Sequence, residues 1–356
     1  MIRQLHDIVV QSGAKNKVIQ LVPPDNAIQE VLAVEIGDNL EIGLTKQVYL
    51  KLFKQVHQQW HQFDPLQWEN NKSAWWDYYY MTLGYLITTN ENHTIITLHE
   101  LLLHKLCHEH GNWVLDNEIE LISVFVSSRL KRVNKSSSLW LLMRKLSILA
   151  ILHRSNEDIQ QKFLDRVFMS CQFHFANYYA NTFLKWYTGI SVVLGQEDYI
   201  GERLKTACHQ NLKDCSLWST LAVWIYPDPY LQHYIDQYNQ LAGQLGQSLL
   251  ALSYVKNTSI CPGPKLNEIK TQLQWLVRVN CRYMYPYTAL LNVVRQSHSD
   301  TKQFVEILNE KLTETYRFFT ETELKESQAY TDALELARTL EKTLELARNS
   351  QNSPPY

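Results

Sequence analysis

The chain has 356 residues, and its 34 basic and 36 acidic side chains give a formal net charge of −2. This balance provides no overall field to collect nucleic-acid phosphates or anionic lipid, so we expect no nucleic-acid partner. Glycine (11 residues) and proline (10 residues) are scarce and 45% of the chain is hydrophobic, which excludes a largely disordered protein and favours helices joined by short turns.

Residues 1–45 have a mixed character. A β-like stretch at 18–22 stops at Pro23 and Pro24, and 34–39 has the composition of a turn. The apolar run at the start of the chain is too short for a secretory signal, and no run reaches the roughly 20 residues needed to cross a bilayer. We therefore expect a short irregular N-terminal lead-in and no transmembrane segment.

The six cysteines are scattered and form no CxxC pair. In a chain without a signal peptide, this pattern is typical of free thiols in a reducing compartment. We therefore predict a cytoplasmic protein.

From residue 46 onward, apolar residues recur at helical spacing. The segments 116–132, 157–171 and 197–212 carry them at i, i+3, i+4 and i+7, as Ile119 and Ile122 illustrate. Each of these segments is expected to be the first helix of a pair.

Four segments share a short polar entry, a small or aliphatic residue and, in three of them, a tryptophan that opens an apolar helix. The aligned positions are Trp75, Trp140, Asn181 and Trp218. The last two intervals are 41 and 37 residues, as in helix-turn-helix repeats. The first interval is 65 residues and requires an insertion, for which 88–116 is the candidate.

Two further helix pairs are expected at 229–256 and 266–295. The stretch 301–349 is expected to form one or two long capping helices, followed by a tail at 350–356. A single hairpin cannot cover its own apolar face, whereas stacked hairpins bury it. We therefore predict an all-α fold, a crescent-shaped α-α superhelix of helical hairpins over residues 46–300.

The repeated segments resemble the repeat of protein prenyltransferase alpha subunits, whose pattern is approximately Asn-Tyr-x-Ala-Trp-x-x-Arg-Arg-Trp. Asn177, Tyr178 and Ala180 keep the opening of this pattern. Lys185 and Trp186 keep the second basic position and the closing tryptophan. This segment departs from the pattern at its central tryptophan and its first arginine.

Two other segments keep different parts of the same pattern. Residues 136–140 keep the central tryptophan, and Arg144 occupies the second basic position. Residues 71–75 keep Asn-x-x-Ala-Trp. The degenerate repeats and the N-terminal lead-in are most similar to the divergent alpha-like group of the family, the prenyltransferase alpha subunit repeat-containing proteins.

The resemblance implies an alpha-type subunit that wraps a beta subunit of the Rab geranylgeranyltransferase type. It implies that the zinc ion and the isoprenoid pocket belong to that beta subunit, so that this chain holds no cofactor. The implied reaction is geranylgeranyl transfer to a cysteine of a protein acceptor, such as a farnesylated longin SNARE. Ala176 stands where the family can supply a lysine to the diphosphate, and we predict no catalytic residue here.

A second hypothesis belongs to a different class. A helical-repeat adaptor that has no enzyme partner would also show degenerate repeats. No glycine-rich phosphate loop, nucleophile elbow or pair of catalytic carboxylates stands out in the sequence. The pattern alone leaves both hypotheses open.

The tryptophans of the repeats are predicted to be core anchors, because a tryptophan at the start of a helix buries about 200 Å² against its neighbour. These anchors are Trp75, Trp140, Trp186 and Trp218. Five other side chains are candidates for facing a partner or substrate, namely Lys135, Arg144, Asn177, Tyr178 and Lys185. Each has a structural alternative, because basic side chains can form ion pairs between repeats and asparagine can cap a helix.

Metal-capable side chains gather at His99, His104, Cys107, His108 and His110. His104, Cys107 and His108 have the i, i+3, i+4 spacing of a zinc site. His99 and His104 are one residue too far apart for the HExxH motif of metallopeptidases. The interleaved leucines favour a packed helix, and we predict no metal site.

Overall fold

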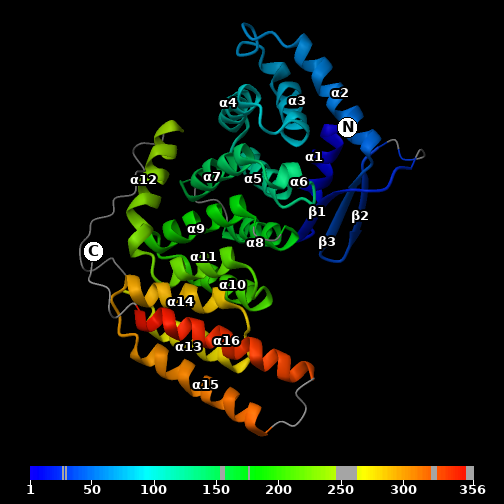
Figure 1. The fold of residues 1–356 in the computed structure, drawn as a ribbon. Coiled ribbons are helices and arrows are strands. Elements are labelled where there is room, and N and C mark those ends of the chain that lie inside the picture. The colour runs from blue at the N-terminus through cyan, green and yellow to red at the C-terminus, as the bar shows by residue number, and fades with distance from the viewer. Residues whose placement is uncertain are drawn as a thin grey trace. The chain divides into compact units, whose positions relative to one another are not determined.

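The computed structural model describes residues 1–25, 28, 30–152, 157–174, 177–245, 263–321 and 327–349. Helices dominate this part of the chain, and a small sheet lies near the N-terminus (Figure 1). The predicted all-α class of helical hairpins is confirmed. The chain forms two compact units, residues 1–183 with 241–250 (unit 1) and residues 184–240 with 251–356 (unit 2).

The described residues between 1 and 45 build regular elements, which corrects the expectation of an irregular lead-in. They form α1 (Ile2–Gln11), β1 (Asn16–Leu21), β2 (Leu32–Ile36) and β3 (Asn39–Leu44). The strand order is β1-β3-β2, with β1 parallel and β2 antiparallel to β3. The turn expected at 34–39 is confined to its centre, where Gly37 adopts a φ of 57° that glycine accommodates without strain.

Unit 1 continues with helices that stack on one another. Helix α5 packs on α7 and α8, and α1 and β1 pack on α5. Helix α4 lies within the stretch 88–116 in which an insertion was predicted. The helices are α2 (Lys46–Gln62), α3 (Trp75–Thr88), α4 (His93–His110), α5 (Trp113–Val126), α6 (Lys131–Asn134), α7 (Ser137–Leu152), α8 (Glu157–Phe173) and α9 (Tyr178–Val193), which runs on into unit 2.

Unit 2 follows the same hairpin scheme. Helix α11 packs on α10 and α14, and α15 packs on α16. Of the pair expected at 229–256, the structure describes one long helix, α12, and residues 246–256 lie outside the described part. The helices are α10 (Glu197–Gln210), α11 (Cys215–Ile225), α12 (Asp228–Gln244), α13 (Leu266–Arg278), α14 (Met284–Gln296), α15 (Lys302–Glu321) and α16 (Gln328–Asn349).

Local chemistry sets where the helices begin and end. The side chains of Thr45, Asn92 and Asp214 accept hydrogen bonds from backbone N–H groups in the first turns of α2, α4 and α11. These N–H groups have no partner inside their own helix, so the caps satisfy them. Gly111 and Gly195 follow α4 and α9 with φ values of 98° and 67°, which favour glycine.

The cores of both units are built from large apolar side chains. Among the described residues, Trp186, Trp218, Tyr79 and Tyr238 are some of the largest that are fully buried. Close packing leaves room only for glycine at position 201, where an added Cβ would lie 2.2 Å from the Trp224 ring. In the described part of the chain, no helix combines the length and apolar character needed to cross a membrane.

Candidate partner-binding site

The four predicted anchor tryptophans lie inside the protein. Trp75 and Trp140 donate their indole N–H groups to the carbonyl oxygens of Trp68 and Asn134, at 3.1 and 2.7 Å. These acceptors precede the helices that the tryptophans open, so each indole fixes the turn that leads into its own helix. Trp186 and Trp218 are 0% exposed.

The motif on α9 separates into a buried part and an exposed part. Ala180 and Trp186 are completely buried, while Tyr178 is 70% exposed. The fully buried Asn177 accepts the N–H of Ala180 at 3.4 Å and thereby caps α9. The capping alternative therefore describes Asn177 better than the partner-facing one.

Asn177 also connects three segments of unit 1. Its amide donates to the side-chain oxygen of Asn134, which precedes α7, and to Ser170 Oγ on α8 at 3.2 Å. The amide of Asn134 in turn donates to Ser170 Oγ and to the Val126 carbonyl, both at 2.8 Å. Because buried amides need these partners, the side chain of Asn177 is occupied inside the protein and does not face a partner.

The three basic candidates differ in their surroundings. Arg144 on α7 donates to the Thr182 carbonyl on α9 at 3.2 Å, so it links two neighbouring repeats. Lys185 is half-buried and no carboxylate pairs with it among the described residues; burial lowers the pKa of its ammonium group. Lys135 is half-exposed at the end of α6. Ala176 lies outside the described residues.

The starts of the second helices in unit 2 carry aromatic and basic side chains. Lys213, which precedes α11, holds its ammonium group 5.1 Å from the centre of the Tyr283 ring, the residue that precedes α14. Tyr285, in the first turn of α14, is 58% exposed. Cys215 is exposed at the start of α11 and interacts electrostatically with Lys185. We call Lys185, Lys213, Cys215, Tyr283 and Tyr285 the turn edge of unit 2.

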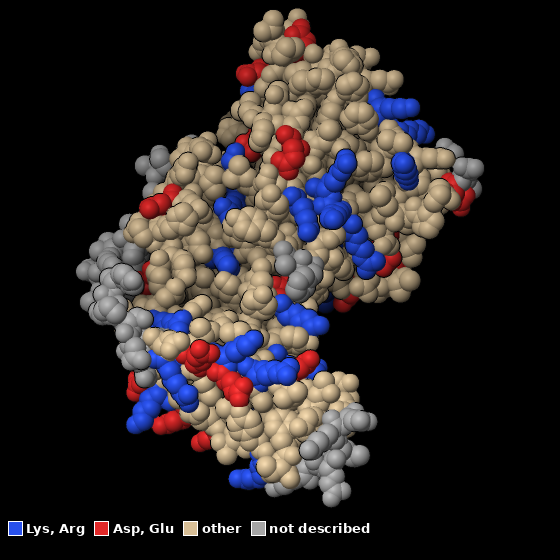
Figure 2. Space-filling model, viewed as in Figure 1, with Lys and Arg blue, Asp and Glu red and all other residues tan. Residues whose placement is uncertain are grey.

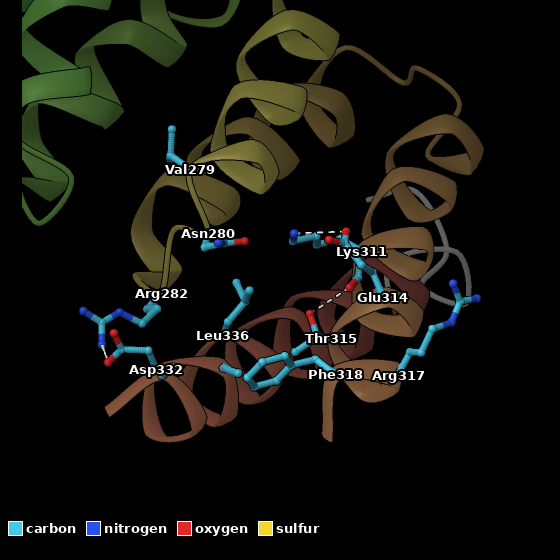
Figure 3. Close-up of a pocket in the computed structure, with 12 residues that line it drawn as sticks. Val279, Asn280, Arg282, Lys311, Glu314, Thr315, Arg317, Phe318, Asp332 and Leu336 are labelled. Carbon is cyan, nitrogen blue, oxygen red and sulfur yellow. Dashed lines mark hydrogen bonds and ion pairs between the residues drawn. The ribbon is translucent and has the colours of Figure 1, made fainter. Parts of the chain in front are cut away.

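A groove of about 670 Å³ lies beyond the turn between α13 and α14 (Figure 3). Val279, Phe318 and Leu336 give it apolar walls. Charged pairs line its rim: Arg282 pairs with Asp332, and Lys311 pairs with Glu314 at 3.0 Å. Arg282 directly precedes Tyr283 in the connection between α13 and α14, so the groove adjoins the turn edge of unit 2. The arrangement offers apolar contact framed by charge, which suits a polypeptide partner.

The histidines and the cysteine of α4 do not form a common site in the described residues, which contain no group of three or more potential metal ligands. His99 is fully buried and binds Glu118 Oε1 at 2.8 Å and Thr82 Oγ1 at 2.9 Å. Tyr79 donates to the other oxygen of Glu118 at 2.5 Å. Burial opposes ionisation of Glu118, but His99 and Tyr79 hold the pKa of its carboxyl below the usual range.

His104, Cys107 and His108 line a separate pocket of about 250 Å³ with several leucines. Lys145 pairs with Glu100 at its border, at 2.8 Å. Burial raises the pKa of Cys107 to about 11, so its thiol is protonated at neutral pH and is a poor nucleophile or metal ligand.

Sequence reasoning missed a buried ionic network in unit 1. Lys17 on β1 contacts Glu120 Oε1 at 2.5 Å, and Arg166 on α8 binds both oxygens of Glu120 at 2.6 and 2.7 Å. Burial alone would raise the pKa of Glu120, but Arg166 and Lys17 lower it; burial lowers the pKa of Lys17. The three residues are far apart in the sequence, so no local pattern indicated the network.

Comparison with known proteins places these features in context. Residues 1–127 match the family model described as the ECM9 N-terminal domain, and residues 139–245 match the one described as the ECM9 middle domain. The chain is similar to ECM9. Protein ECM9 of Saccharomyces cerevisiae (strain ATCC 204508 / S288c) is 27% identical over 267 residues, which cover 73% of this chain and 68% of that protein. No solved structure matches the chain.

The boundary between the two matched regions lies at the connection between two helices. The stretch between them, 128–138, contains α6 and connects α5 to α7. The second match ends at 245, directly after α12.

Proposed function

We propose that this chain is the alpha-type subunit of a heterodimeric protein prenyltransferase that transfers a geranylgeranyl group to a cysteine of a protein acceptor. Its role is to bind the beta subunit and to help select the acceptor. The beta subunit, of the Rab geranylgeranyltransferase type, supplies the zinc ion and the isoprenoid pocket. The complex acts in the cytoplasm, and a farnesylated longin SNARE is the acceptor class that the resemblance suggests.

The observation that supports this proposal is that α9 has both buried and exposed residues of the repeat pattern. Ala180 and Trp186, which match the alpha-subunit repeat, pack inside the protein, whereas Tyr178 projects from the start of the helix. Lys185, about two turns further along α9, is a half-buried cation to which no described carboxylate is paired. A helix start that presents an aromatic ring and an uncompensated cation is suited to a protein partner, because such groups gain most when an interface covers them.

The turn edge of unit 2 and the neighbouring groove extend the same argument. Exposed Tyr285 and the Lys213–Tyr283 contact repeat the pairing of aromatic and basic groups at the starts of α11 and α14. These positions correspond to the second helices of successive hairpins. A beta subunit bound along these helix starts of unit 2 would cover both of them.

Co-expression tests the proposal. The full chain is produced with a Rab-type prenyltransferase beta subunit, and we expect a stable 1:1 complex that transfers geranylgeranyl to a farnesylated acceptor. The double variant Tyr178→Ala/Lys185→Met should bind the beta subunit at least about 10-fold more weakly, since aromatic and basic anchors at an interface commonly contribute more than 1 kcal/mol each. The melting temperature of the isolated chain should hardly change.

Tyr316→Ala is the control for loss of an exposed tyrosine ring, because Tyr316 on α15 is 43% exposed and does not line the groove. It should leave complex formation intact. If the wild-type chain binds no prenyltransferase beta subunit, the enzyme proposal fails and the adaptor hypothesis takes its place.

A further inference from the structure

The net charge of −2 conceals a strongly cationic region in unit 1. No acidic residue occurs in α2 or anywhere between Glu120 and Glu157. Figure 2 shows Lys and Arg side chains gathered over α2 and over the connection between α5 and α7, on the same side of the molecule. We call this surface the cationic face; its exposed or half-exposed members are Lys46, Lys51, Lys54, Arg129, Lys131, Arg132 and Lys135.

The two parts of the cationic face are joined by hydrogen bonds at the end of α3. Tyr49 on α2 donates to the Ile87 carbonyl at 2.8 Å. Asn90, which follows α3, donates to the Arg132 carbonyl at 2.9 Å. Burial raises the pKa of Tyr49, and the positive charge of Arg132 opposes that shift. The cations of α2 and of the α5–α7 connection therefore belong to one surface.

The cationic face is not neutralised by the protein. Among the described residues none of its seven cations takes part in an ion pair. Two carboxylates lie at its border, but Glu91 accepts hydrogen bonds from Ser137 and Ser138, and Glu41 accepts one from Gln20. Arg129 donates to the same Gln20 side chain, at 2.9 Å.

Polar groups beneath the face are unsatisfied as well. Ser128, next to Arg129, is fully buried, and its hydroxyl has no hydrogen-bond partner in the described structure. The Nε2 atom of His174 is also buried and has no hydrogen-bond partner among the residues that the structure describes. Burial lowers the pKa of His174, a hydrogen bond with the Ser128 backbone opposes this shift, and the positive charges of Lys135 and Lys131 lower the pKa further. An anionic group bound here would relieve the mutual repulsion of the cations.

We infer that the cationic face binds the surface of an anionic membrane. Lysine and arginine side chains spread over separate elements suit a broad layer of anionic head groups, to which each contributes about 5-fold in binding. Leu50, 47% exposed, lies one turn from both Lys46 and Lys54 and can enter the head-group region. None of the seven cations lines the groove of unit 2 or the pocket beside α4 that are described above. The exposed apolar residue of the cationic face is aliphatic rather than aromatic, unlike the stacking surfaces of proteins that bind single-stranded nucleic acid.

Vesicle co-sedimentation with the full chain tests this inference. We expect binding to vesicles of phosphatidylcholine with phosphatidylserine, little binding to phosphatidylcholine alone, and weaker binding at high salt. Replacing Lys131, Arg132 and Lys135 by glutamine should reduce the partition coefficient by roughly 100-fold, as three losses of about 5-fold each predict. A second variant, with Lys46, Lys51 and Lys54 replaced by glutamine on a different helix, should show a similar loss.

The matched control replaces Lys270, Arg338 and Lys342 by glutamine, which removes the same charge from exposed positions in unit 2. It should bind like the wild type, and thermal melts should show that all three variants are folded. Equal binding to both vesicle types would overturn the inference. So would a chain that ignores vesicles and binds an RNA oligonucleotide or a polyglutamate peptide through these residues. The assay needs no beta subunit, so its failure leaves the proposed function untouched.

Discussion

At the scale of single residues, the molecule places several charged side chains in its interior and pairs each of them. Glu118 is completely buried, yet His99 and Tyr79 satisfy both of its oxygens. Glu120 is shared between Lys17 and Arg166. Burying an unpaired charge costs several kcal/mol, whereas a fully hydrogen-bonded pair costs much less, so these contacts fix which helices and strands lie together.

The Glu118 network predicts an acid-sensitive stability. Because its pKa is lower in the folded chain than the unfolded value of about 4.3, Glu118 contributes stability that is present above that pH and is lost as the pH falls through the folded pKa. We expect the free energy of unfolding to fall between about pH 5 and pH 3 in the wild type, and less steeply in Glu118→Gln. Urea unfolding across this range measures both slopes.

The control for this prediction is Glu306→Gln, which changes an exposed glutamate on α15. It should keep the wild-type slope. If the free energy of unfolding fell with equal slope in the wild type and in Glu118→Gln, this carboxylate would not be the cause of the loss of stability in acid.

At the scale of elements, pairs of helices are fitted to each other by the size of the residues between them. Helix α10 approaches α11 at Gly201, where the Trp224 ring fills the space of a side chain. The same tryptophan donates its indole N–H to the Glu197 carbonyl at 3.0 Å, at the start of α10. One large and one minimal side chain therefore set the separation of the two helices.

Two glycine substitutions distinguish packing from helix propensity. Gly201→Ala should destabilise the protein by roughly 1–3 kcal/mol, because a new methyl group would overlap the Trp224 ring. Gly243→Ala, in α12 with no atom near the added group, should stabilise it by about 0.5–1 kcal/mol through better helix propensity. Thermal or urea unfolding measures both, and equal effects of the same sign would contradict this account of α10 and α11.

At the scale of the whole molecule, the N-terminal residues are an integral part of unit 1. Leu5 and Val9 on α1 are buried, and α1 packs on α3 and α5. Lys17 on β1 donates to the carbonyls of Val9 and Ser12 at 2.6 and 2.8 Å in addition to meeting Glu120. Removing this segment would expose apolar surface and leave Glu120 without one of its two cations.

Deletion of residues 1–45 is therefore expected to destabilise the remaining chain strongly. Buried aliphatic side chains such as Leu5 and Val9 contribute about 1.5–3 kcal/mol each, so we expect an aggregated product or a thermal transition that loses its cooperativity. Circular dichroism of the soluble fraction measures this. Ile36→Ser, at a 72% exposed position of β2, is the control and should melt like the wild type. A truncated chain with the wild-type melting temperature would show that the segment is dispensable.

The sequence by itself determined the features that depend on neighbours along the chain. Apolar spacing located the helices α8, α10, α13 and α14, and the polar entry followed by tryptophan located the starts of the second helices, because a helix period and a cap are local properties. The same local motif made Tyr178 and Lys185 candidates for facing a partner, and this role stays a prediction; Tyr178 is exposed and Lys185 half-buried.

Only the tertiary structure decided which polar groups are buried and which charges gather. The sequence left Asn177 open between a helix cap and a partner-facing residue, and the contacts with Asn134 and Ser170, from other segments, place its side chain inside the protein. The ionic network around Glu120 and the cationic face likewise join residues that are distant in sequence. The net charge of −2 is a sum over the whole chain and does not show where charges of one sign gather. Burial and electrostatic potential depend on distances in space between residues of different segments, and the periodicity of a single segment gives no information about those distances.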